Sequence, residues 1–338
     1  MNALLPMAAF VVVVAGLRAA KQLILPFLFA LVLAVLVLPA VRFLERNRVP
    51  RGIAVAFSVF GVFGILVGVG TVLGQIAQQF STALPRYQEA LSDDYAAAMA
   101  WLAEKGVEPS LMDPGGWFDP GDAMVYVGTS LNSALDILSN TLLVALTMAF
   151  ILAEAAGIPD KWRRAFGETS NQAAQWGALA GKVQRYLALK TIISALTGLL
   201  LGTFVALLGL DFPVLWGLLV FALNFVPTIG SIIAAIPPVL LALIQLGPGY
   251  ALGVGVGFLA VNLSIGNLLE PRIMGDQLGL SPMIVFLSLV FWGWLWGPMG
   301  MLLSVPLTVV MRNVLDHRDD TRWLAVLLGP NRDAAIRG

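Results

Sequence analysis

A short polar stretch, NLLEPRIMGDQLGLSP at residues 267–282, interrupts a chain that is otherwise strongly apolar. It places a carboxylate at Glu270 and a guanidinium at Arg272, separated by Pro271, and it adds a potential hinge at Gly275. Two groups at this spacing can pair to end a helix, can act as a gate or coupling site, or can contact a polar substrate directly. The sequence leaves these three roles open.

The apolar run before this stretch, residues 250–268, carries two asparagines. Asn267 lies three residues before Glu270, a spacing that places both side chains on one face of a helix. We therefore expect Asn267 and Glu270 to face the same groove, with Asn262 as a further polar group on this run.

Composition indicates the solvent in which these side chains lie. Of 338 residues, 59% are hydrophobic and 12% are charged, and the mean hydropathy is +0.87. A globular domain averages about 25% charged residues, so the chain is predicted to be an all-α polytopic membrane protein. The zero net charge argues against nucleic-acid binding. With no cysteine and one histidine, His317, we expect no metal, no cofactor and no intramembrane enzyme.

Ten apolar runs divide the chain, and six of them are expected to cross the bilayer completely, which takes roughly 20 residues. These six are residues 3–17, 23–41, 52–74, 131–152, 187–209 and 250–268.

The polar connections predict the orientation of these spans. Segments 42–51 and 153–190 and the C-terminal tail are rich in lysine and arginine, so the positive-inside rule places them, with both termini, in the cytoplasm. Segment 75–130 has two basic residues, Arg86 and Lys105, against eight acidic ones, and is expected outside.

The four remaining runs form two pairs that are predicted to be re-entrant helical hairpins. The first pair, 213–224 and 229–246, is separated by NFVPTIG, and the second pair, 281–296 and 298–312, only by Gly297. Each pair would enter the bilayer and return to the same side, the first from outside and the second from inside. The C-terminal half would then consist of two units of opposite orientation, each a span followed by a hairpin.

Prolines occur at the same spacing in both hairpins. Pro213 precedes Pro237 by 24 residues, and Pro282 precedes Pro306 by 24 residues. Broken helices that meet near the membrane midplane are where transporters place a substrate. The alternative for the tryptophans of the second hairpin is packing or interfacial anchoring. The residues expected along the pathway and at the hairpin tips are Asn224, Pro227, Thr228, Gly230, Ser231, Pro237, Asn262, Asn267, Trp294, Pro298, Gly300 and Pro306.

The chain is thus divided into five parts. These are N-terminal spans (1–74), an outer helical segment (75–130), a span followed by a helix lying at the cytoplasmic interface (131–186), the two span-and-hairpin units (187–316) and a cytoplasmic tail (317–338). For the outer segment, a cap packed on the chain's own spans and a contact between subunits both remain open.

Two long motifs, EPRIMG at 270–275 and FWGWLWGPMGMLLSVPL at 291–307, closely resemble the autoinducer-2 exporter (AI-2E) family of bacterial membrane proteins. The layout of the rest of the chain also fits this family. The resemblance implies a transporter in the bacterial inner membrane, assembled as a homo-oligomer with a pentamer expected. It also implies export of autoinducer-2, a small polar quorum-sensing signal, whereas other members are linked to exchange of alkali cations for protons.

The leading hypothesis is therefore a secondary transporter of a small polar molecule, plausibly autoinducer-2, that works by alternating access. The first alternative is a cation/proton antiporter, which would couple to a proton or alkali cation but lacks an acid in the middle of a span. A membrane scaffold or sensor that binds a partner through segment 75–130 is the second alternative.

Overall fold

The computed structural model describes residues 4–106, 141–155, 157, 161, 171–227, 229–274, 279–316 and 321–329, and every regular element in these ranges is helical. The all-α prediction is therefore confirmed for the described chain. In chain order the helices are α1 (Leu4–Ala19), α2 (Lys21–Arg46), α3 (Arg51–Glu104), α5 (Thr141–Glu154), α7 (Asn171–Leu207), α8 (Pro213–Leu223), α9 (Ile229–Leu246), α10 (Pro248–Val261), the π-helix η2 (Asn262–Leu269), α11 (Glu270–Met274), α12 (Pro282–Trp296), α13 (Pro298–Asp316) and α14 (Arg322–Leu327).

Six of the described helices are long and apolar enough to cross a membrane, as expected for a multi-pass membrane protein. Four of them coincide with predicted spans, namely those within α2, α3, α7 and α10–η2. The other two, α9 and α13, are second arms of the predicted hairpins. The helices at the other two predicted spans, α1 and α5, have 16 and 14 described residues and are not among the six. The predicted re-entry of the two hairpins stays a prediction.

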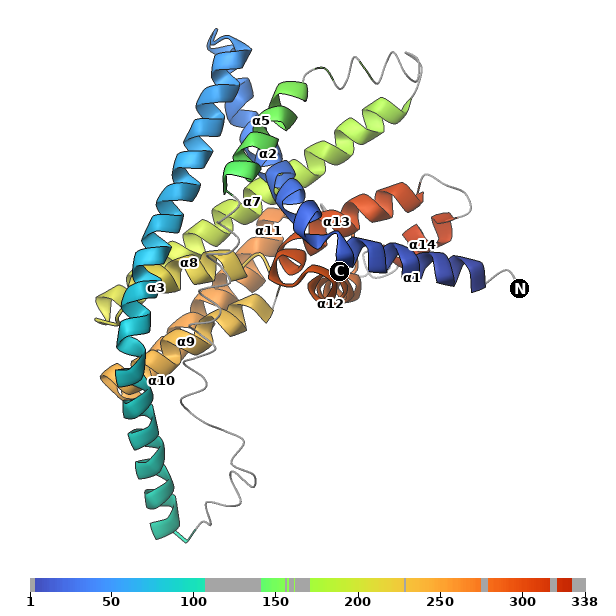
Figure 1. Ribbon diagram of the computed structural model, residues 1–338. Helices are drawn as coiled ribbons and strands as arrows, with labels where there is room; N and C mark the ends of the chain where they lie inside the picture. Colours follow the sequence, from blue (N-terminus) through green and yellow to red (C-terminus); the bar gives the residue numbers. More distant parts are fainter. Residues whose placement is uncertain are drawn as a thin grey trace.

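Two helices are longer than the sequence pattern suggested. Helix α3 has 54 residues, about 80 Å at 1.5 Å per residue, and continues from its span far into the outer segment (Figure 1). Helix α7 has 37 residues and includes residues 171–186. The expectation of a separate helix at the cytoplasmic interface was wrong for residues 171–186, because no proline interrupts the sequence from there to the end of the span. Residues 162–170 of that expected helix lie outside the described ranges.

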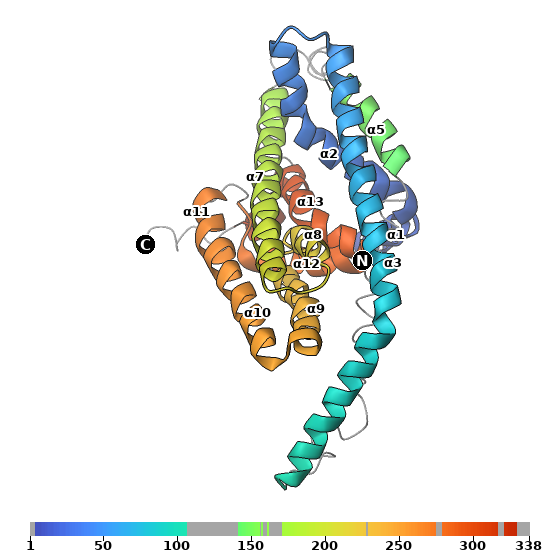
Figure 2. The ribbon, with the colours of Figure 1, turned by 90° about the vertical axis from the view of Figure 1, so that its left-hand side faces the viewer.

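Helix α7 lies at the centre of the bundle and joins its parts (Figures 1 and 2). Its C-terminal half packs with α8, α9, α10 and α3 around the buried Trp216 and Phe80. Its preceding turns pack with η2 and α13 around Leu187 and Val305. The N-terminal helices form separate clusters, one of α2, α3 and α5 and one of α1, α2 and α12–α13.

Glycines bring α7 and α8 into backbone contact. A Cβ built on Gly198 would lie 2.5 Å from the carbonyl oxygen of Gly217, and one built on Gly202 would lie 3.2 Å from the Gly217 Cα. Small residues at such crossings allow membrane helices to pack closely without a large side chain between them. The first arm of the first hairpin is therefore held tightly against the central helix.

The two hairpins, α8–α9 and α12–α13, turn in the same way. A Cβ on Gly230 would lie 1.9 Å from the carbonyl oxygen of Leu223, and a Cβ on Gly300 would lie 1.9 Å from that of Trp292. Each second arm thus begins with a glycine pressed against the backbone of its first arm. This shared packing agrees with the repeated proline and glycine pattern of the two hairpins.

Candidate functional site

A buried ion pair joins α7 to the polar stretch at residues 267–282. The Lys190 Nζ lies 2.5 Å from a carboxylate oxygen of Glu270, and the two side chains are 3% and 21% exposed. Arg272, which the sequence suggested as a possible partner, is exposed. Charges with this little access to water are costly unless they are paired, and they are often functional. The pair therefore makes Lys190, which sequence reasoning assigned only to the basic cytoplasmic segment, a central site residue.

The polar side chains of α7 continue from this pair toward the first hairpin. Lys190, Ser194 and Thr197 are all buried and follow one another at helical spacing. The Asn224 amide, at the end of α8, donates a 3.0 Å hydrogen bond to Ser194 Oγ. One face of α7 thus connects the ion pair to the tip of the first hairpin. A polar i, i+4, i+7 stripe in an apolar helix was the sequence signal that could have revealed it.

A π-helix leads into Glu270. Helix η2 spans Asn262–Leu269 and separates α10 from α11. A π-helix has i→i+5 hydrogen bonds and a wider turn than an α-helix, and such segments occur often at functional sites. The Asn262 carboxamide lies over Gly266, since its oxygen would be 3.1 Å from a Cβ built there. Glu270 therefore follows a segment whose helical register differs from that of its neighbours.

The predicted residues of the first hairpin lie at or near its turn. Gly230 and Pro237 are buried, whereas Pro227 and Ser231 are half-buried. Asn224 contacts the α7 stripe through the hydrogen bond described above. Thr228 and Gly275 lie outside the described residues, as do the side chains of Asn267 and Pro271.

The predicted residues of the second hairpin are not gathered around the ion pair. Trp294 is 57% exposed, and the Arg18 guanidinium lies 5.1 Å from the centre of its ring. Pro298 is exposed and Gly300 is buried at the turn. Pro306 lines a small apolar cavity of about 90 Å³ between α2, α7 and α13. The expected convergence of both hairpins on one polar site is therefore not observed among the described residues.

The other two tryptophans of the second hairpin have structural partners. Trp292 Nε1 donates a 3.1 Å hydrogen bond to Thr308 Oγ1 within the hairpin, and Trp296 Nε1 donates a 3.1 Å bond to the Leu17 carbonyl of α1. Both rings are buried. These two tryptophans therefore have the packing role that the sequence left open as an alternative.

A second polar network connects α3 to the opening of the first hairpin. The Tyr87 hydroxyl donates a 2.7 Å hydrogen bond to the Asp211 carboxylate. The Asp211 backbone donates to Gln245, and its carbonyl accepts from the Trp216 indole. Tyr87 is buried against the same cluster. This part of the outer segment therefore packs on the chain's own helices.

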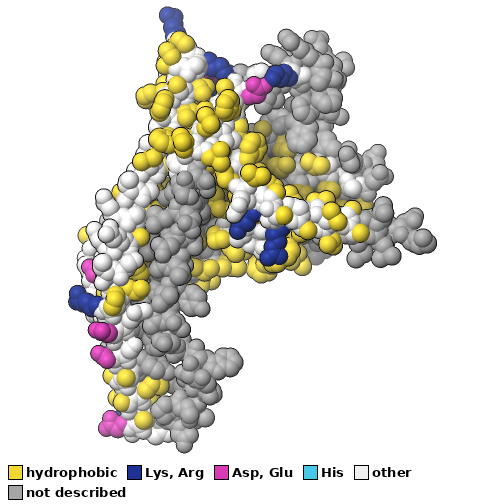
Figure 3. All heavy atoms as spheres, in the orientation of Figure 1, with side chains coloured by type: hydrophobic (Ala, Val, Ile, Leu, Met, Phe, Trp, Pro, Cys, Tyr) yellow, Lys and Arg dark blue, Asp and Glu magenta, His cyan; other side chains and the backbone are white. Residues whose placement is uncertain are grey.

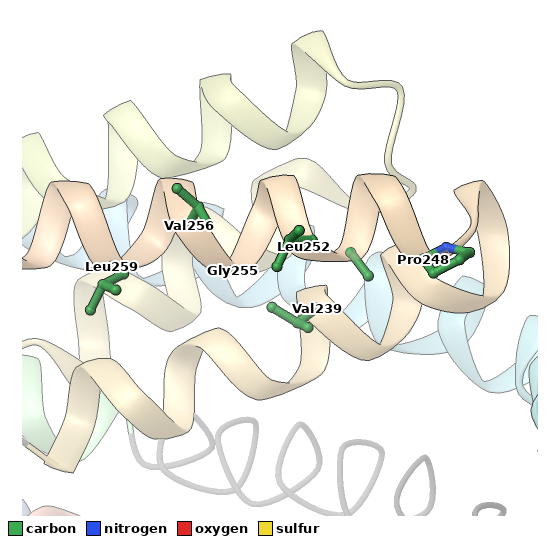
Figure 4. A pocket seen from close by; sticks show the side chains of 7 residues that line it. Val239, Pro248, Leu252, Gly255, Val256 and Leu259 are labelled. Carbon is green, nitrogen blue, oxygen red and sulfur yellow. The ribbon is translucent and has the colours of Figure 1, made fainter.

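One surface hollow of the described structure is lined by apolar side chains. It lies between α9 and α10, has a volume of about 430 Å³, and is lined by side chains such as Val239, Leu252 and Leu259 (Figure 4). Acidic side chains gather along the C-terminal half of α3 (Figure 3). A groove of this kind offers no group that would orient a polar substrate.

Comparison with known proteins identifies the family of this chain. Residues 7–319 match the family described as AI-2E family transporter. The chain belongs to the AI-2E transporter family. The AI-2 transport protein TqsA of Escherichia coli (strain K12) is 39% identical over 318 residues, which cover 94% of this chain and 92% of TqsA.

Two further relatives match with similar coverage. A putative transport protein of Haemophilus influenzae is 36% identical over 98% of this chain and 97% of its own length. Putative transport protein YhhT of Escherichia coli (strain K12) is 35% identical over 98% of this chain and 95% of its own length. The family resemblance predicted from the EPRIMG and FWGWLWGPMG motifs is confirmed.

Proposed function

We propose that this AI-2E protein is a secondary transporter that moves a small polar molecule, with autoinducer-2 as the expected substrate, across the bacterial inner membrane. The observation that carries this proposal is the buried polar path of Lys190, Glu270, Ser194 and Asn224 inside an otherwise apolar helical bundle. The likeness to a protein named for AI-2 transport supports the choice of substrate.

We infer that the Lys190–Glu270 pair acts as a gate in an alternating-access cycle. Glu270 follows directly on the π-helix η2. Conversion of η2 to α-helical hydrogen bonding would rotate Glu270 relative to α7, because the residues per turn change. Separation of the two charges would open the path toward Ser194 and Asn224. Water or substrate hydroxyl groups would then solvate both charges while the pair is open.

The proposed orientation has both termini in the cytoplasm and two re-entrant hairpins that enter from opposite sides. The first arm of the first hairpin, α8, has 11 residues, about 16 Å of helix, which is about half of the hydrocarbon thickness. The arms of the second hairpin have 15 and 19 residues. Its re-entry is inferred from the basic tail that follows it. A homo-oligomer, with a pentamer expected, is part of the same proposal.

Cysteine labelling tests this topology, since the chain has no native cysteine. Gly249→Cys, beside the first hairpin, is expected to react with an impermeant maleimide only in right-side-out vesicles, and Asp316→Cys only in inverted vesicles. Pro227→Cys, at the turn of the first hairpin, should be protected from reagent applied on the cytoplasmic side, opposite the hairpin's opening. Modification of this turn from the cytoplasmic side would mean that the first hairpin crosses the membrane.

Transport can be measured directly in proteoliposomes. We expect the purified protein to release trapped autoinducer-2, detected with a luminescent reporter strain, faster than protein-free liposomes do. Asn224→Ala removes the bond to Ser194 and should slow this flux roughly tenfold. Asn47→Ala, in an exposed turn, is the matched control and should leave flux unchanged. Absence of flux at every imposed ion gradient would rule out this substrate.

The antiporter alternative gains no support. Within the described candidate spans, acidic residues occur only in the terminal turns, and the Glu270 carboxylate is paired with Lys190. A proton-exchange carboxylate usually lies at membrane depth and facing a cavity.

A further inference from the structure

Two cations lie together where α1 meets α2, beside the turn of the second hairpin. Arg18 is in the last turn of α1 and stacks on Trp294 of α12, and Lys21 is the first residue of α2. Lys21 Nζ would be 3.7 Å from a Cβ built on Gly297. The two positive charges therefore flank the same turn.

The described helices that meet at this turn supply no counter-charge. The chain has no acidic residue from position 1 to 44 or from 277 to 315, ranges that include α1, α12 and nearly all of α2 and α13. Among the described residues, the cations in ion pairs are Arg51, Lys161 and Lys190, not Arg18 or Lys21. Interactions with helix ends are weak and leave the charges themselves uncompensated.

The surface around the two cations is apolar and exposed. Val11, Val12 and Val13 of α1 are 58–70% exposed, and Leu23 of α2 is 79% exposed. Trp294 is exposed as well, and tryptophan with neighbouring Lys or Arg is enriched where membrane proteins meet lipid headgroups. The occupant must therefore be anionic at one end and apolar at the other.

We propose that this site binds an anionic phospholipid, with the headgroup phosphate between Arg18 and Lys21 and the acyl chains along the exposed faces of α1 and α2. A phosphate can accept hydrogen bonds from both cations. An anionic lipid such as phosphatidylglycerol is favoured over a zwitterionic one, because a choline or ethanolamine group would bring a further positive charge. The bound lipid would join α1, α2 and the turn of the second hairpin.

The test compares lipid retention by the purified full-length protein in detergent, measured by native mass spectrometry during titration. Phosphatidylglycerol should bind more tightly than phosphatidylcholine of identical chains. Arg18→Gln with Lys21→Gln should weaken phosphatidylglycerol binding about twenty-five-fold, from roughly fivefold for each cation. Lys105→Gln is the matched control, because Lys105 also lies over a tryptophan, Trp101, at 5.9 Å, but is directly preceded by the acidic Glu104.

Three results would overturn the proposal. They are equal retention of the two lipids by the unchanged protein, unaltered phosphatidylglycerol affinity in the double variant, and displacement of the lipid by millimolar inorganic phosphate. The first comparison needs no variant, so the test holds even if the double variant folds poorly. The result does not depend on the transported substrate, and it stands or falls separately from the transport proposal.

Discussion

Glu270→Met is expected to destabilise the protein by about 3–5 kcal/mol, because it leaves the Lys190 ammonium buried without its carboxylate. Lys190→Met should cost less, since the Glu270 side chain, 21% exposed against 3% for Lys190, retains access to water. The double variant Lys190→Met with Glu270→Met removes both charges and should recover most of the stability, because apolar replacements of a buried pair are often neutral. Thermal unfolding in detergent, followed by loss of monodisperse protein, measures this order.

The same variants separate a gate from a structural ion pair. If the pair is a gate, the stable double-methionine variant should still transport at least about tenfold more slowly than the unchanged protein. Two methionine side chains cannot hydrogen-bond to water or substrate when they separate, so the open state would not be stabilised. Glu45→Gln is the control for stability, because Glu45 and its partner Arg51 are 30% and 36% exposed, and a pair with this access to water should contribute about 1 kcal/mol or less. Flux equal to that of the unchanged protein in the double variant would show that the pair only holds α7 against α11.

Gly230→Ala and Gly300→Ala are each expected to cost at least about 3 kcal/mol or to prevent accumulation of folded protein. In both cases the new methyl carbon would lie 1.9 Å from a backbone carbonyl oxygen, of Leu223 or Trp292. Backbone cannot move aside as a side chain can, so the two arms of the hairpin must separate. The amount of folded protein in the membrane and its unfolding temperature in detergent are the measurements.

Gly253→Ala on α10 is the matched control for these two substitutions. Nothing lies within 4 Å of a Cβ at this position, and the residue is within a helix. Alanine favours a helix interior over glycine by roughly 0.5–1 kcal/mol, so this variant should be neutral or slightly stabilised. If Gly230→Ala and Gly300→Ala behave like this control, the close turn of the hairpins is not a feature of the folded protein.

Several features of the fold were predictable because their signals are local. Runs of apolar residues reveal membrane helices, and the prolines and glycines at 213–237 and 282–306 mark where helices begin and turn. The EPRIMG and FWGWLWGPMG motifs indicated the family in the same way. The continuity of α7 from Asn171 was missed because the change from polar residues at 171–190 to the apolar run that follows suggested two separate helices.

The candidate site was predictable only in part. Glu270 and Asn224 were singled out from sequence, but their partners, Lys190 and Ser194, were not, because those contacts join residues 80 and 30 positions apart. Sequence spacing suggested Arg272 as the partner of Glu270. The Glu270 side chain instead points toward α7, where it pairs with Lys190.

By itself, then, the sequence determined that the chain is a helical membrane protein of the AI-2E family with two helical hairpins near its C-terminal end. Those properties depend on hydropathy, helix breakers and motifs, which are read within a few residues. Only the tertiary structure showed that α7 carries the polar path, that Lys190 forms an ion pair with Glu270, and that Arg18 stacks on Trp294 at the surface. These depend on which helix faces meet, and close glycine contacts such as that of Gly198 with Gly217 fix those faces in space.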